Sequence, residues 1–212
     1  MDNLVSEIAN KIDTGNPQQV ASVPGDVKQA VESGIPVKEI LEKGLLDGMD
    51  RLGQKFKRNE VFIPEVLFAA KAVHEAMEIL RPLMRSAGVK PLGKIVLGTV
   101  KGDLHDIGKH LVGIVLEGCG LEVVDIGIDV SAEEFVKAAQ THQPDIVGLS
   151  ALLTTTMPEM PKVIKAFGAA GLNNKIIVGG APITQEFADQ IGADGYSPNA
   201  SETADLVKKL LQ

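Results

Sequence analysis

A short segment bounded by two glycines carries an imidazole and a carboxylate two residues apart: Asp103 and His105 lie between Gly102 and Gly108. A histidine that binds a metal usually has its second ring nitrogen held by an oxygen acceptor, which fixes its tautomer. Asp103 is placed to be that acceptor, and the glycines let the backbone approach a bulky ligand. The residue types therefore predict a ligating histidine, against the alternative that a single loop histidine is solvated or packed.

Two further segments have the composition of a binding site. Hydroxyls are concentrated between Ser150 and Thr156, and a diglycine stands at Gly179-Gly180. Each alone is common in turns, but three such segments at one sheet edge favour a site. Gly98, Gly102 and Gly108 are separated by four and six positions, so they do not match a G-x-G-x-x-G dinucleotide turn. Lys109 is not followed by Ser or Thr, which also excludes a P-loop.

The second half of the chain predicts the elements that bring these segments together. Short apolar runs occur at 95–98, 123–126, 146–149, 176–178 and, more weakly, 193–196. Amphipathic helical stretches separate them at 107–117, 132–140, 160–170, 184–191 and 201–211. Strict alternation predicts a doubly wound, five-stranded parallel sheet of the flavodoxin-like type. Ligands bind beyond the carboxyl ends of such strands, which is where the three segments fall.

The first half of the chain is predicted to be helical. Residues 27–52 carry one apolar stripe with a break at Gly34-Ile35-Pro36, and residues 63–84 carry a stronger one. We expect a bundle of four or five helices, the first of them weak. A linker is expected at 89–93, so the predicted domains are a helical domain over 1–90 and an α/β domain over 91–212.

Composition excludes several classes of function. The 212 residues carry 21 basic and 28 acidic side chains, a net charge of −7, which argues against a nucleic-acid partner. One cysteine, Cys119, cannot form an internal disulfide. No apolar run approaches the roughly 18 residues of a membrane span, and residues 1–10 do not resemble a signal peptide. We therefore expect a soluble cytoplasmic protein with no nucleic-acid or membrane partner.

The three segments together resemble the signature of the cobalamin-binding family. That signature is D-x-H-x-x-G, then S-x-L, then G-G, matched here from Asp103 to Gly108, by Ser150 and Leu152, and by Gly179-Gly180. The intervals are similar to those of the methionine-synthase-type module. The helical half resembles the family's cap domain through residues 53–56 and 61–64. The resemblance covers about residues 5–210.

The resemblance implies a cobalamin or related corrinoid, cycling between methyl-Co(III) and Co(I), in the base-off/His-on form. His105 would be the metal ligand, with Asp103 and Thr156 as its proton relay, a role that Thr154 or Thr155 could share. Phe56 and Ile63 would shield the upper face, while for Phe62 the same role and a place in the bundle core stay open. The implied cofactor-binding residues are Gly102, Asp103, Leu104, His105, Asp106, Ile107, Gly108, Ser150, Leu152, Thr154, Gly179, Gly180, Phe56 and Ile63.

The resemblance also implies a role. At 212 residues the chain fits a cap and a cofactor domain, so we expect a methyl carrier without turnover of its own. Its expected partners are a substrate-specific methyltransferase, a second methyltransferase with tetrahydrofolate or coenzyme M as acceptor, and a reductive activator. The alternative is the small subunit of an adenosylcobalamin-dependent mutase, and a third option is a cobalamin-dependent sensor. The methyl donor, the acceptor, the lower base of the corrinoid and the oligomeric state stay open.

Overall fold

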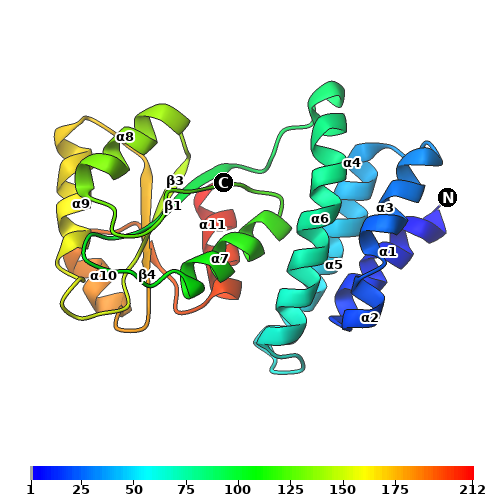
Figure 1. Cartoon of the computed structure of the whole chain (residues 1–212), viewed down its shortest axis with the longest axis horizontal. Helices are drawn as coiled ribbons and strands as arrows, with labels where there is room; N and C mark the ends of the chain where they lie inside the picture. The colour runs from blue at the N-terminus through cyan, green and yellow to red at the C-terminus, as the bar shows by residue number, and fades with distance from the viewer. Residues whose placement is uncertain (1) are drawn as a thin grey trace. The chain divides into compact units, whose positions relative to one another are not determined.

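The computed structural model describes residues 2–212, except for the side chains of residues 2, 3, 57, 85 and 201. The chain separates into two compact units, residues 1–91 with 117–120 and residues 92–116 with 121–212. Figure 1 shows a unit built of helices and a unit in which helices surround a sheet. Within the described residues, no helix is both long enough and apolar enough to cross a membrane.

The helical unit has one long helix and several shorter ones. Its elements are α1 (Asp2–Thr14), α2 (Pro17–Val20), α3 (Val23–Glu32), α4 (Val37–Glu39), the π-helix η1 (Ile40–Leu46), α5 (Asp47–Lys57) and α6 (Ile63–Ala87). The prediction of a weak first helix is wrong, because α1 runs for 13 residues. It fully buries Ile8, Ala9 and Ile12, and this packing compensates for its polar composition.

The predicted break in the apolar stripe of residues 27–52 is confirmed. Helix α3 ends at Glu32 and Gly34 takes a φ of +76°, while Ile35 stays buried. The π-helix η1 was not predicted. Its hydrogen bonds join residues five apart instead of four apart, and this difference leaves a similar apolar stripe in the sequence. Gly44 and Gly48 lie against α1, where a Cβ at Gly48 would come within 2.8 Å of the Ile12 Cβ.

The second unit confirms the doubly wound fold. Its strands are β1 (Lys94–Thr99), β2 (Glu122–Asp125), β3 (Ile146–Ser150), β4 (Lys175–Gly179) and β5 (Gly195–Tyr196). All pairs are parallel, in the order β2-β1-β3-β4-β5. The helices are α7 (Ile107–Gly118), α8 (Ala132–His142), α9 (Glu159–Ala169), α10 (Gln185–Ile191) and α11 (Ala200–Leu210). In this order β1 and β3 lie side by side at the switch point, so the loops that follow them share one edge.

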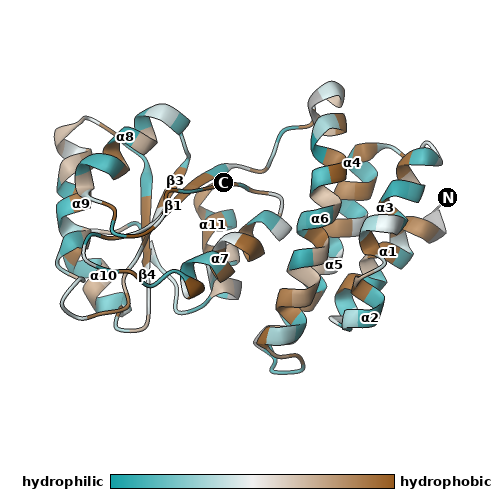
Figure 2. Cartoon of the chain, in the orientation of Figure 1, coloured by the Kyte–Doolittle hydropathy of each residue, from teal (hydrophilic) through white to brown (hydrophobic). Residues whose placement is uncertain are grey.

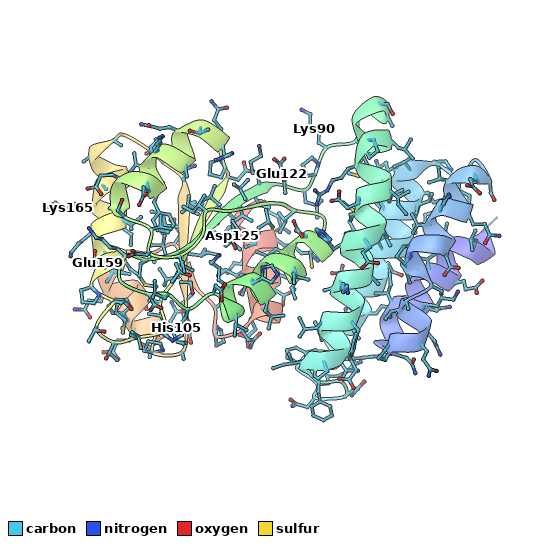
Figure 3. All side chains as sticks on the ribbon, viewed as in Figure 1. Lys90, His105, Glu122, Asp125, Glu159 and Lys165 are labelled. Carbon is cyan, nitrogen blue, oxygen red and sulfur yellow. The ribbon has the colours of Figure 1, made fainter. Side chains whose placement is uncertain are left out.

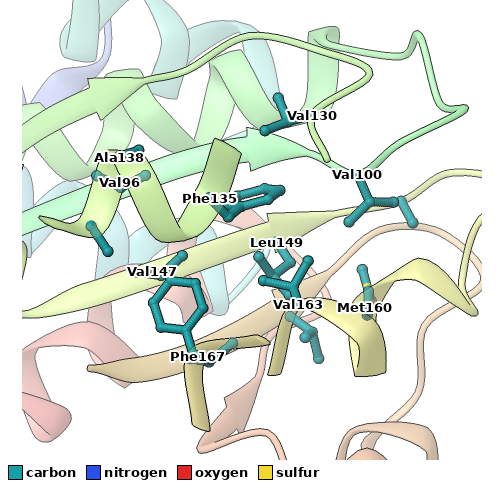
Figure 4. Packing of buried hydrophobic residues seen from close by; sticks show 14 of the residues in the cluster. Val96, Val100, Val130, Phe135, Ala138, Val147, Leu149, Met160, Val163 and Phe167 are labelled. Atoms are coloured by element: carbon teal, nitrogen blue, oxygen red, sulfur yellow. The ribbon is translucent and has the colours of Figure 1, made fainter. Parts of the chain in front are cut away.

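The sheet is covered on both faces. Helices α8, α9 and α10 lie on one side and α7 and α11 on the other (Figure 1). The central strands are apolar while the surrounding helices carry both polar and apolar faces (Figure 2), as expected for a buried parallel sheet. Phe135 of α8 and Phe167 of α9 pack over Val96 and Val147 of the strands (Figure 4). Gly98 makes room for this packing, because a Cβ there would come within 2.6 Å of the Phe135 ring.

Phe135→Ala is expected to destabilise the α/β unit by about 3–5 kcal/mol, since it removes a fully buried ring and leaves a cavity. Urea unfolding of the whole protein measures this. Phe62→Ala is the matched control: that ring is 66% exposed, so its loss is expected to change the free energy of unfolding by less than about 0.5 kcal/mol. Equal effects of the two substitutions would contradict the assignment of the core.

Candidate functional site

The loop between β1 and α7 places His105 at the carboxyl-end edge of the sheet. Strand β1 ends at Thr99 and α7 begins at Ile107, so His105 lies just before the first turn of the helix (Figure 3). Gly102 turns the loop with a φ of +81°. The His105 side chain is half exposed, whereas the Asp103 carboxylate is fully buried. The loop thus presents an imidazole to the outside and holds its carboxylate partner inside.

Asp103 is the centre of a hydrogen-bond network. Its Oδ1 lies 2.7 Å from Nδ1 of His105 and accepts a 3.1 Å bond from the His105 backbone N–H. Its Oδ2 accepts bonds from the Leu152 and Leu153 N–H groups at 2.7 and 3.3 Å, and from the Thr156 hydroxyl at 2.7 Å. The β1 and β3 loops are therefore joined through one carboxylate. The structure brings His105, Asp103 and Thr156 together.

The network determines the charge of Asp103 and, through their shared bond, the tautomer of His105. Burial alone raises the pKa of Asp103, but hydrogen bonds from the Leu152 N–H, the Thr156 hydroxyl and His105 outweigh it and hold the pKa well below its usual range. Asp103 is then an ionised acceptor, so Nδ1 of His105 must carry the hydrogen of their shared bond. In the neutral imidazole this tautomer leaves Nε2 with the lone pair that a metal ligand requires.

Thr156→Val is expected to lower the free energy of unfolding by about 1.5–3 kcal/mol at neutral pH, because a buried carboxylate loses a hydroxyl donor. With that donor gone, the pKa of Asp103 rises toward the ordinary 3.8. A depressed carboxyl pKa stabilises the fold above the unfolded value and loses this contribution as the pH falls toward the folded value. The gap between variant and wild type is therefore expected to narrow below about pH 4.

Urea unfolding of the apoprotein between pH 7 and pH 3 measures this gap. Thr156→Ser keeps the hydroxyl and is the matched control, expected to follow the wild type in its pH dependence. A gap between Thr156→Val and the wild type that stays constant across the whole range would show that the hydroxyl does not act through the carboxylate.

A cavity of about 580 Å³ opens beside His105, within the α/β unit. Its floor is made by Leu97, Gly148 and Ile177, which stand at one register position of β1, β3 and β4. Helix α7 lines it from one side, and residues at the start of α11 line it from another. The lining is mainly apolar, with hydroxyls at Ser150, Ser197 and Thr203. This cavity suits an extended group that enters from the edge where His105 lies.

The diglycine after β4 borders the cavity where two strand ends approach each other. The Ala151 N–H donates a 3.2 Å bond to the Gly179 carbonyl. Gly180 has a φ of +132°, and a Cβ added there would lie 1.8 Å from the Ala151 carbonyl oxygen. A side chain at Gly180 is therefore excluded by the protein's own backbone. Gly108 also lines the cavity and has open space where its Cβ would be.

The other predicted residues of the α/β unit differ in whether they line the cavity. Around His105, the apolar side chains of Leu104, Ile107 and Leu152 are exposed, while Asp106, Ile107, Ser150 and Leu152 line the cavity. Thr154 and Thr155 lie exposed on the turn after β3 and do not line the cavity, so a contact of Thr154 with a ligand stays a prediction. Of the three threonines, Thr156 is the one that bonds to Asp103.

In the helical unit, Phe56 is half-buried, and Ile63 is exposed at the start of α6. Phe62 is 66% exposed, so its alternative place in the bundle core is wrong. Two neighbouring apolar side chains that the bundle leaves uncovered are available to contact a ligand or a partner.

Several site residues were missed in the sequence. Lys109, considered there only as part of a P-loop, is buried, lines the cavity and forms an ion pair with Asp125 at the end of β2. Gly148 had a detectable signal, since a glycine inside an apolar strand often marks a close approach of a ligand or backbone. A Cβ there would lie 2.5 Å from the Leu97 Cδ2. Ser197 and Thr203 share a 2.9 Å bond that follows from the fold rather than from any spacing.

These features fit a large, flat ligand with an extension. The imidazole with its free Nε2 suits a metal at the centre of such a ligand, and exposed Leu104 and Ile107 suit an apolar macrocycle around it. The deep cavity suits the extension. Comparison with family models agrees, since residues 93–205 match the B12 binding domain, and residues 9–81 match a second B12 binding domain model. The chain belongs to the B12-binding family.

Other members of the B12-binding family resemble the chain over nearly its full length. Dimethylamine corrinoid protein 3 of Methanosarcina acetivorans is 39% identical, over 100% of this chain and 98% of that protein. A cobalamin-binding protein from Desulfitobacterium hafniense DCB-2 has a TM-score of 0.79 and 31% identity, covering 97% and 98% of the two chains. The methanol:cobalamin methyltransferase complex MtaBC from Methanosarcina barkeri has a TM-score of 0.85 and 29% identity, covering 99% of this chain and 80% of that chain. The chain therefore shares the fold of these relatives over nearly its whole length.

Proposed function

We propose that this protein is the corrinoid methyl carrier of a methyltransferase system. The observation that carries the proposal is the half-exposed His105, oriented by Asp103 and Thr156 beside a deep apolar cavity. A corrinoid bound there supplies a cobalt centre that accepts a methyl group from one partner and gives it to another. The names of the relatives, which are corrinoid proteins and a methanol:cobalamin methyltransferase complex, support this role.

The residues have separate parts in this proposal. His105 binds the cobalt through Nε2, in the base-off/His-on form, because Nδ1 is engaged by Asp103. Asp103 and Thr156 hold the imidazole in this tautomer. The network of His105, Asp103 and Thr156 as a whole is proposed to take up a proton when the demand for an axial ligand changes. Gly108, Ser150, Gly179 and Gly180 border the cavity that takes the tail of the corrinoid.

The helical domain has a protective part in the proposal. Phe56 and Ile63 are proposed to shield the upper face of the corrinoid, and the exposure of Ile63 on the helical unit leaves it free for such a contact. The proposed domains are the helical cap over 1–90 and the corrinoid domain over 91–212. Apolar side chains suit this task because they exclude water without offering a competing ligand.

Methyl transfer of this kind needs partners. The first is a substrate-specific methyltransferase, supported by the methyltransferase complex among the similar structures. A second methyltransferase, with tetrahydrofolate or coenzyme M as acceptor, and a reductive activator complete the proposed system. The mutase alternative is not favoured, since the chain shares its full length with corrinoid proteins named for methylamines.

The carrier role predicts that the protein has no turnover by itself. The cobalamin-loaded, reduced protein is mixed with isotope-labelled dimethylamine or methanol and with tetrahydrofolate or coenzyme M. No labelled product is expected until a substrate methyltransferase and an acceptor methyltransferase are both added. His105→Ala is the control that removes the proposed ligand and is expected to slow transfer in the complete mixture. Appreciable transfer by the protein alone would overturn the carrier role.

A further inference from the structure

We infer that Thr99 is a positioning residue for His105. The inference rests on the proposed function, in which His105 is the axial ligand. Thr99 is the last residue of β1 and its side chain is fully buried. Its hydroxyl Oγ1 donates a 2.9 Å hydrogen bond to the backbone carbonyl of His105. A buried strand residue thus reaches across the loop to the main chain of the ligating residue.

Thr99 is itself fixed at the base of the loop. Its backbone N–H donates to the Gly127 carbonyl at 3.0 Å, and its carbonyl accepts from the Val130 N–H at 3.0 Å. The next residue, Val100, donates to the Ser150 carbonyl at 3.0 Å, on the β3 side. The end of β1 is therefore hydrogen-bonded on both sides, and these bonds fix the position of the backbone that carries the Thr99 hydroxyl.

The carbonyl of His105 needs such a donor. His105 stands two residues before α7, so its carbonyl lies outside the hydrogen bonds of the helix. On the other side of the same residue, the His105 N–H is bound by Asp103 at 3.1 Å. The residue is thus held at its N–H by Asp103 and at its carbonyl by Thr99. Together the two bonds set the direction of the Cα–Cβ bond, and therefore where Nε2 points.

Asp103 and Thr99 act on different parts of His105. Asp103 contacts the ring as well as the backbone N–H and sets the tautomer, whereas Thr99 contacts the backbone carbonyl alone and leaves the ring chemistry unchanged. Loss of the Thr99 hydroxyl is therefore expected to weaken coordination without changing which ring nitrogen binds the cobalt. This separates its role from that of the proposed proton relay.

The test measures how well His105 competes for the cobalt. Each variant is loaded with cobinamide, a corrinoid that has no lower base of its own, and is reduced to Co(II). It is then titrated with ¹⁵N-labelled imidazole, and the titration is followed by electron paramagnetic resonance. Axial ¹⁴N from His105 splits the cobalt lines into triplets, and ¹⁵N from the competitor gives doublets. Loss of one ordinary hydrogen bond is expected to lower the half-displacement concentration about fivefold to tenfold in Thr99→Val.

Four further variants accompany this measurement. Thr99→Ser keeps the hydroxyl and is expected to stay within about twofold of the wild type, while Thr99→Ala behaves like Thr99→Val, so the Ser/Ala pair suffices if the valine variant does not fold. Thr141→Val removes a threonine that donates to the Lys137 carbonyl far along the chain in α8, and is expected to change nothing. His105→Ala is expected to give doublets alone.

The outcomes distinguish the two proposals. Triplets that persist in His105→Ala would overturn the axial assignment, and with it the basis of this inference. Doublets alone in His105→Ala, with equal half-displacement concentrations in Thr99→Val, Thr99→Ala and the wild type, would overturn the role of Thr99 and leave the carrier function standing. The role of Thr99 would also be overturned if the half-displacement concentration of Thr99→Ser fell to that of Thr99→Ala. The same conclusion would follow if imidazole displaced His105 in none of the variants.

Discussion

Replacing His105 with alanine is expected to abolish the axial nitrogen signal of the protein loaded with cobinamide, a corrinoid that has no lower base of its own. The imidazole is half exposed with Nδ1 engaged by Asp103, so Nε2 is the ring nitrogen free to bind a metal. Without it the cobalt of this corrinoid has water as its lower ligand. Electron paramagnetic resonance of the Co(II) form is expected to lose the triplets completely, and the visible absorption of the Co(III) form to shift accordingly.

His110→Ala is the matched control for this experiment. His110 is exposed and lies on α7, five residues beyond His105, so its loss removes an imidazole from the same unit. It is expected to leave the axial nitrogen signal intact. If His110→Ala abolished the signal and His105→Ala did not, the ligand would have been assigned to the wrong histidine.

Gly180→Ala is expected to have the second large effect. The new Cβ would lie 1.8 Å from the Ala151 carbonyl oxygen, in a backbone conformation with a φ of +132°. Backbone atoms on both sides of this contact belong to strand ends, so neither can move without disturbing the sheet edge. We expect a loss of about 3 kcal/mol or more in the free energy of unfolding. Cobalamin affinity is expected to fall about 100-fold or more, because the clash would displace a wall of the cavity.

Gly171→Ala separates the clash from the backbone strain. Gly171 also has a positive φ, +66°, but open space where a Cβ would stand. It is expected to lose about 1 kcal/mol of stability and no cobalamin affinity. Thermal unfolding and calorimetric titration with cobalamin measure both quantities. Similar results for the two variants would show that the close approach of Gly180 to Ala151 is not what restricts this position.

The alternating elements of the α/β unit could be predicted because the central strands β1, β3 and β4 are short apolar runs that the fold largely buries. Periodicity also located the helices between the strands, and the strand order followed from general rules for parallel sheets. The π-helix at Ile40–Leu46 could not be found in this way, since an apolar stripe does not record the length of its hydrogen bonds. The extent of α1 also depended on packing rather than on its own composition.

The candidate site divides in a similar way. Asp103 and His105 are neighbours in the chain, so their pairing was visible in the sequence, and Thr156 followed from a resemblance to family spacing. Thr99 and Lys109 were missed because their partners are chosen by the fold. The Lys109 ammonium reaches Asp125 at the end of β2, and the Thr99 hydroxyl donates to the carbonyl of His105, six residues further along the chain. No local pattern distinguishes such a threonine from an ordinary strand residue.

The saturation of Asp103 by donors has a thermodynamic consequence for cofactor capture. Its partners at Leu152, Leu153, Thr156 and His105 all come from the polypeptide itself. The loss of conformational entropy in ordering the two loops therefore belongs to folding, and the imidazole is preorganised for its ligand. Mutations that loosen this network are expected to appear first as a less favourable entropy of cobalamin binding, before the fold itself fails.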